Sequence, residues 1–152
     1  MNRSLPESTL RARLESQLVL FGEEKKKFLD EYFPVYGKKR IDISHYLSEY
    51  AVTVDKLLQT VEDDTALHQR VWVGSEVTLS YLPDMGKERF VIELPNLANA
   101  DDNQISFLSP VGMTLLLAEK GDVVTIETPS AVVRVRIDDI RLTPEPFGAW
   151  ML

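Results

Sequence analysis

A change of hydrophobic period near residue 70 constrains the fold of this chain more than any other feature. Before that point, apolar residues recur at helical spacing. From Arg70 onward, apolar and polar residues alternate, and Val, Ile and Thr are enriched. Because helices repeat every 3.6 residues and strands every two, the pattern predicts two domains. Residues 1–69 form the helical domain and residues 70–152 the β-rich one.

Two helices are predicted in the first domain. Ser8 or Thr9 can cap the first helix, and Pro34 ends it. Its apolar face consists of Leu14, Leu18, Phe21, Phe28 and Tyr32. The second helix has a regular heptad seam formed by Ile43, Leu47, Tyr50, Val54, Leu57 and Val61. We expect an antiparallel helical hairpin, a coiled-coil arm about 30–38 Å long at about 1.5 Å per residue. The alternative is a helical pair folded flat on the other domain.

The second domain is predicted to be α+β. Four segments alternate with a period of two and form a mostly antiparallel sheet: 71–82, 88–94, 122–128 and 131–142. Residues 96–104 are expected to be a polar loop. Ser109 and Pro110 start one short helix, since proline is favoured at the first helical position. The tail beyond residue 142 is expected to be irregular.

Composition excludes several classes of function. The chain has no cysteine and only two histidines, so disulfides and thiolate metal sites are excluded and histidine-based catalysis has few candidates. It lacks an apolar run of about 20 residues and the apolar core of a signal peptide, so a cytoplasmic protein that does not enter a membrane is expected. The net charge is −7, with basic clusters only at 25–27 and 38–40. We therefore expect a protein partner rather than free DNA.

The segment 105–129 resembles the C-terminal domain of the Gre transcript-cleavage factors of bacterial RNA polymerase. The segment matches three parts of the family pattern in order. These are Ile-Ser-x-x-Ser-Pro-x-Gly, then Leu-Leu, then Gly-Asp-x-Val-x-x-x-Thr-Pro. The matching residues include Ser109, Pro110, Gly112, Gly121, Asp122, Thr128 and Pro129. The likeness extends over roughly residues 70–142, and residues 71–82 resemble the family's opening strand.

This resemblance implies an architecture and a role. Gre factors join an N-terminal coiled coil to a globular domain with the FK506-binding-protein-like fold. The globular domain docks on RNA polymerase, and the coil enters the secondary channel. Acidic residues at the coil tip help to hold a Mg²⁺ ion in the polymerase's own active site. The resemblance therefore implies a regulator that is not itself an enzyme, with no cofactor or small-molecule substrate of its own. It would meet nascent RNA or DNA only through the polymerase.

The predicted tip departs from the family sequence Asp-Leu-Lys-Glu-Asn-Ala-Glu-Tyr. Asp42 matches the family's tip aspartate, but His45 stands where the glutamate would be. Imidazole is a poor ligand for Mg²⁺, so the departure favours occupancy of the channel over stimulation of cleavage. Asp30 and Glu31 are substitute acids, or else solvated helix-end residues. Asp42 is a candidate ligand of the shared Mg²⁺ and also a candidate N-cap of the second helix.

Basic residues also fall at the predicted tip. Lys38, Lys39 and Arg40 are candidates for contact with RNA phosphates or with the acidic centre of the polymerase. The alternative is that they form a solvated loop.

Two other functions are open. The helical hairpin could belong to an interaction module that binds a different protein, and the fold class also includes prolyl isomerases. The aromatic residues of the second domain are scattered, which does not favour an isomerase pocket.

Overall fold

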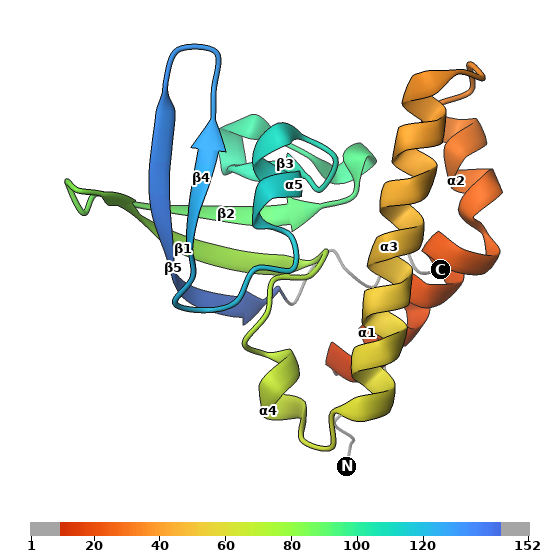
Figure 1. The fold of residues 1–152 in the computed structure, drawn as a ribbon, viewed down its shortest axis with the longest axis horizontal. Helices are drawn as coiled ribbons and strands as arrows, with labels where there is room; N and C mark the ends of the chain where they lie inside the picture. Colours follow the sequence, from red (N-terminus) through yellow and green to blue (C-terminus); the bar gives the residue numbers. More distant parts are fainter. Residues whose placement is uncertain (1–9, 144–152) are drawn as a thin grey trace. The chain divides into compact units, whose positions relative to one another are not determined.

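The computed structural model describes residues 10–143, which separate into two compact units at Leu67 and His68. The first unit is helical and the second is built on a sheet (Figure 1). The candidate caps Ser8 and Thr9 and the predicted irregular tail lie outside the described residues, apart from Thr143, which donates its hydroxyl to the carbonyl of Gly74 at 2.8 Å. Within the described range, no helix is both long and apolar enough to cross a membrane.

The first helical stretch is interrupted, where the sequence predicted one helix. It consists of α1 (Leu10–Leu18), a π-helical turn η2 (Val19–Glu23) and α2 (Lys25–Tyr32). Gly22 lowers the helix propensity at this point. The five residues that follow Gly22 are all charged, so none of them adds an apolar side chain to the core. The wider turn nevertheless keeps the two predicted apolar positions inside, because Phe21 and Phe28 are both buried and meet edge to face.

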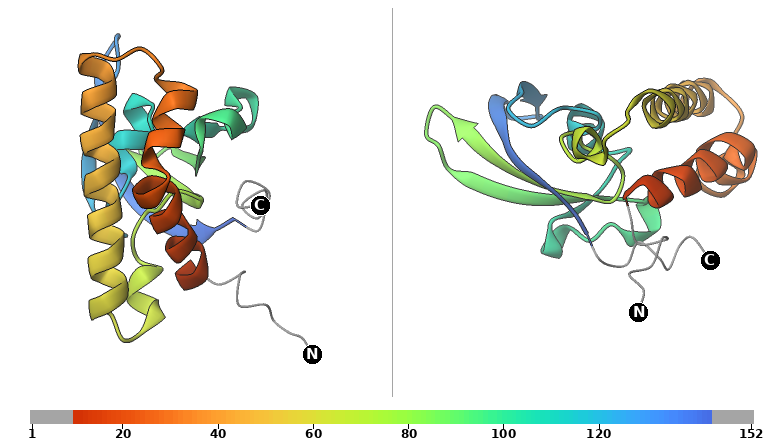
Figure 2. Two further views of the ribbon diagram at one scale, coloured as in Figure 1. Left: turned by 90° about the vertical axis from the view of Figure 1, so that its right-hand side faces the viewer. Right: turned by 90° about the horizontal axis from the view of Figure 1, so that it is seen from below.

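The second helix, α3 (Lys38–Thr60), is continuous (Figure 2). The heptad seam explains its buried face. The first four seam residues are buried, namely Ile43, Leu47, Tyr50 and Val54. The last two, Leu57 and Val61, are only partly buried. A short helix, α4 (Asp64–Leu67), ends the unit and buries Leu67.

Side-chain contacts fix how the first stretch lies against α3. Arg11 donates to the carbonyl of Leu58 at 3.0 Å. Further along the first stretch, Lys25 donates to Ser48 at 2.7 Å. A later residue of the first stretch therefore contacts an earlier residue of α3. The two helical stretches therefore lie side by side and run in opposite directions.

The second unit contains a five-stranded sheet in the order β3-β2-β1-β5-β4. The strands are β1 (Ser75–Leu82), β2 (Lys87–Glu93), β3 (Gln104–Ser106), β4 (Val123–Glu127) and β5 (Val132–Leu142). The central strand β1 pairs antiparallel with β2 and with β5, as the alternation predicts. The core of the unit includes Trp72, Leu79, Phe107 and Ile137, all of them buried.

The prediction of a mostly antiparallel sheet missed one edge strand, which is parallel to its neighbour. β3 runs parallel to β2, with Ile92 facing Ile105, so the sheet is mixed. The segment predicted as a polar loop contains two 3₁₀ turns, η3 (Pro95–Leu97) and η4 (Ala100–Asp102). These turns carry the chain back along the sheet, so that β3 starts in the same direction as β2.

A β-bulge in β5 gathers polar side chains on the sheet. Asp138 has no partner on β1, because the neighbouring pairs are those of Asp139 and Ile137. Its carboxylate accepts hydrogen bonds from Lys87 and from Arg136, both at 2.8 Å, and from Ser80. The hydrogen bond from Lys87 is the main cause that holds the pKa of Asp138 well below its usual range. These hydrogen bonds join the bulge in β5 to side chains of β1 and β2.

The short helix α5 (Pro110–Leu115) starts where the sequence predicts. The Ser109 hydroxyl accepts from the Gly112 amide at 3.1 Å and donates to the Ser106 carbonyl at 2.7 Å. A Cβ on Gly112 would lie 2.2 Å from the Ser106 carbonyl oxygen. Glycine is therefore required for α5 to pack this closely on the end of β3.

The remaining motif residues form the two turns around β4. Gly121 has a φ of 95°, which favours glycine, and the Asp122 carboxylate accepts from the Glu119 amide at 2.9 Å. After the strand, Thr128 bonds to Ala131 and closes the β4–β5 turn, which contains Pro129. The residues of the 105–129 motif thus have evident structural roles.

Candidate functional site

The candidate site is the loop end of the helical unit, defined as residues 33–45, together with the facing part of α2. Pro34 has no amide hydrogen, and it follows Phe33, the C-cap of α2. Gly37 is the N-cap of α3 and offers no side chain to its free amides. The prediction that Asp42 caps this helix is wrong, because the helix starts at Lys38 and Asp42 lies in its second turn.

Arg40 holds the loop end together. Its guanidinium donates to the Phe33 carbonyl at 3.0 Å and to Asp30 Oδ1 at 2.8 Å. It also lies over the ring of Tyr36, with its Cζ atom 4.2 Å from the ring centroid. Arg40 is only 7% exposed. One side chain thus ties the end of α2 and the connecting loop to the first turn of α3.

The two aspartates of the site are each paired with cations. Asp30 accepts a hydrogen bond from Lys26 at 2.9 Å and another from Arg40. Both bonds lower the pKa of Asp30, and the bond from Lys26 has the larger effect. Asp42 accepts from Lys38 at 2.8 Å, and this bond lowers its pKa. Both aspartates are therefore ionised at neutral pH. The exposed Lys38–Asp42 pair adds little stability and can exchange for another partner.

These acids do not converge on a Mg²⁺ ion. Asp42 follows Arg40 by two residues, which is about 200° around a helix. Since Arg40 reaches towards Asp30, Asp42 projects from the opposite side of α3. Mg²⁺ requires several oxygen ligands in near-octahedral geometry. Within residues 10–143, no three acidic or histidine side chains are placed to hold a metal. The donor set here does not fit a magnesium site made by this chain alone.

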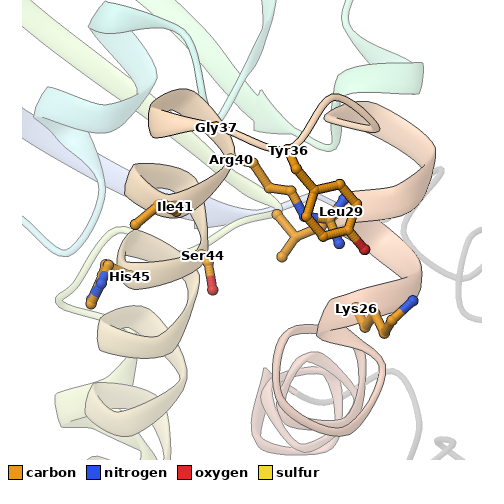
Figure 3. Close-up of a pocket in the computed structure, with 8 residues that line it drawn as sticks. All are labelled: Lys26, Leu29, Tyr36, Gly37, Arg40, Ile41, Ser44 and His45. Carbon is orange, nitrogen blue, oxygen red and sulfur yellow. The ribbon is translucent and has the colours of Figure 1, made fainter.

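An open pocket of about 440 Å³ lies beside the Arg40 side chain (Figure 3). α3 contributes Arg40, Ile41, Ser44 and His45 to its lining, α2 contributes Lys26 and Leu29, and the loop contributes Tyr36 and Gly37. The pocket combines apolar side chains with an aromatic ring and cations. Tyr36 is 73% exposed and Ile41 is 56% exposed, so both are accessible to a ligand.

The loop end is basic although the chain is acidic. Residues 25–45 carry six lysines and arginines and three acidic residues, so their formal charge is +3 in a chain of −7. Lys38 and Lys39 are exposed on the first turn of α3. This charge favours an acidic or phosphate-bearing partner.

The structure places the predicted tip residues in two groups. The structure brings together Asp30 and Arg40, and it places Lys38 beside Asp42. Glu31 is exposed on α2, and His45 lines the pocket. Sequence reasoning missed Tyr36, which looked like part of a turn. It also missed Ile41, whose position outside the heptad seam was the available signal.

Comparison with known proteins identifies the family that the second unit resembles. Residues 66–142 match the family described as transcription elongation factor, GreA/GreB, C-terminal domain. A protein named transcription elongation factor GreA from Bacillus licheniformis is 34% identical over 88 residues, which is 56% of each chain. One of the same name from Desulfovibrio desulfuricans is 36% identical over 81 residues, covering 53% of this chain and 50% of that protein. The chain matches about half the length of these curated relatives.

A solved structure supports the fold. The prokaryotic transcription elongation factor GreA/GreB from Nitrosomonas europaea superposes with a TM-score of 0.54 at 22% identity, over 80% of this chain and 93% of that one. This likeness concerns the fold alone. The family match covers residues 66–142, just over half of the chain, and this range agrees with the likeness over roughly residues 70–142 predicted from the sequence. The chain therefore belongs to the GreA/GreB family of transcription elongation factors.

Proposed function

We propose that this chain binds bacterial RNA polymerase and regulates transcription elongation. The observation that carries the proposal is the family match over residues 66–142, which spans the whole sheet of the second unit. In the proposal, the second unit docks on the polymerase. The helical unit inserts its loop end into the secondary channel as the family's coiled coil does. The chain changes the activity of the polymerase and does not itself catalyse a reaction.

We further propose that the chain occupies the channel without supporting transcript cleavage. Two features of the loop end favour this mode. His45 stands where the family has an acid, and Asp42 projects away from Asp30. The factor would therefore bring at most one carboxylate to a shared Mg²⁺. Its positive charge suits an approach to the acidic, metal-binding centre of a polymerase.

Capture of RNA polymerase from a bacterial lysate by the tagged full chain tests the first part. We expect the polymerase subunits to be retained at moderate salt. An untagged matrix and an unrelated acidic protein of similar size serve as controls. Failure to retain polymerase would overturn the docking proposal, and retention of another protein instead would favour the interaction-module alternative.

A transcript-cleavage assay on stalled elongation complexes tests the mode of action. We expect no stimulation of cleavage by the chain, and slower cleavage when it competes with an active Gre factor. Asp42→Ala should leave this competition unchanged. Robust cleavage that disappears in Asp42→Ala would contradict the occupancy mode and identify Asp42 as a metal ligand.

A further inference from the structure

The pocket at the loop end has the chemistry of a nucleotide site. We propose that it binds a nucleoside phosphate, with the base against Tyr36 and the phosphate beside the cations of α2 and α3. This inference does not rest on the proposed function, because the chain would bind the nucleotide in the absence of RNA polymerase. Its source is the pocket, whose lining combines apolar side chains, an aromatic ring and cations.

The shape and the apolar lining suit a base. A volume of about 440 Å³ falls within the range of about 300–1,000 Å³ typical of small-molecule pockets. Leu29 and Ile41 provide apolar contacts on the two helices that border it. Bases stack on aromatic rings regardless of sequence, because each base has a π face. An accessible tyrosine beside two aliphatic side chains therefore offers a suitable surface for a base.

The aromatic ring is held in place before a ligand arrives. The Arg40 guanidinium lies over Tyr36 at 4.2 Å and is itself fixed by Phe33 and Asp30. Tyr36 nevertheless remains 73% exposed. A ring that is already positioned loses less entropy on binding than a free one. An exposed tyrosine in a mobile loop would not have this advantage.

The charge selects a phosphate over a neutral ligand. Lys26 and Arg40 line the pocket and share Asp30 between them, so two cations face one acid. His45 adds an imidazole at the α3 side. Lys39 precedes Arg40 in the first turn of α3 and is exposed. The site therefore keeps an excess of positive charge after the internal ion pairs are counted.

Titration of the isotope-labelled full chain with AMP, followed by amide NMR shifts, tests the proposal. We expect the shifts to concentrate at Gly37, Ile41, Ser44 and His45. Ribose 5-phosphate, which lacks the base, and adenosine, which lacks the phosphate, should each bind more weakly than AMP. A short oligoadenylate forms a second arm. If the oligoadenylate binds more tightly than AMP, the ligand is the end of a nucleic-acid strand. If AMP binds more tightly, the ligand is a free nucleotide.

Variants connect the binding to the pocket. Tyr36→Ala should weaken AMP binding by about fivefold or more, since base stacking is the contact removed, whereas Tyr36→Phe should retain it. Lys26→Ala should weaken binding more than Lys27→Ala, which removes the same charge from a neighbouring exposed position outside the pocket. Val52→Ala on the exposed part of α3 is the control for folding.

Two results would overturn the proposal. One is the absence of shifts with both AMP and the oligonucleotide at millimolar concentration. The other is equal binding of AMP and ribose 5-phosphate with no effect of Tyr36→Ala, because attraction between charges alone would then explain it. Polymerase is absent from this experiment, so its outcome is independent of the proposed docking.

Discussion

At the scale of single residues, burial changes the role of charged side chains that look solvated in the sequence. Arg40 is part of a basic run, yet it is buried and holds the loop end together. Its neighbours Lys38 and Lys39 are exposed. Lys38 pairs with Asp42, which follows it by about one helical turn.

Glu93 shows the same effect in the second unit. It is 1% exposed, and within the described part of the chain its Oε2 atom has no hydrogen-bond partner. Burial raises its pKa from 4.5 to about 7. The folded chain therefore holds this proton more tightly than the unfolded chain does. The resulting stabilisation is complete below about pH 4.5 and is lost as the pH rises through about 7.

Glu93→Gln should remove this pH dependence. Between pH 5 and pH 8, the free energy of unfolding of the unmodified chain should fall by on the order of 2–3 kcal/mol relative to that of the variant. Urea unfolding at the two pH values measures the difference. Glu127→Gln, at an exposed position on β4, should follow the unmodified chain. Parallel pH profiles for the Glu93 variant and the unmodified chain would show that this carboxyl does not titrate in the range.

At the scale of elements, the sequence predicted the type and position of helices and strands better than the way in which they are connected. The heptad seam of α3 and the Ser109 cap of α5 are both found where the pattern put them. The parallel strand β3 and the π turn η2 were not foreseen. Strand direction depends on how far the 3₁₀ turns carry the chain back, and the π turn depends on packing of Phe21. Neither is encoded in a local periodicity.

Gly112→Ala tests the close contact that fixes α5 to the sheet. The added methyl group would lie 2.2 Å from the Ser106 carbonyl oxygen, so helix and strand must separate. We expect a loss of about 1–3 kcal/mol in the free energy of unfolding. Gly86→Ala is the matched control, because its Cβ would meet nothing within 4 Å. If both variants unfold at the same urea concentration, α5 is not held by this contact.

At the scale of the whole molecule, the two units are proposed to divide the work between docking and action. The family match lies almost entirely in the second unit, while the basic loop end lies in the first. A charge change at the loop end should therefore alter the effect on transcription without preventing capture of polymerase.

The double variant Lys38→Glu and Lys39→Glu measures this division. We expect polymerase capture to persist, and the inhibition of an active Gre factor to weaken by about tenfold at low salt, since local potential raises association rates by at least that factor. Lys56→Glu, further along α3, should have a smaller effect. Loss of capture in the double variant would place the main docking contact in the helical unit instead.

The sequence by itself determined the division into a helical and a β-rich half, the seam of α3, the turns around β4 and the family. Each of these depends on neighbouring residues or on short motifs, so local pattern is sufficient. Only the tertiary structure decided that Arg40 turns inward, that Asp30 and Asp42 do not converge, and that Tyr36 borders a pocket. These features depend on contacts between α2, the loop and α3, and no periodicity along one helix specifies the side chains that face it from another.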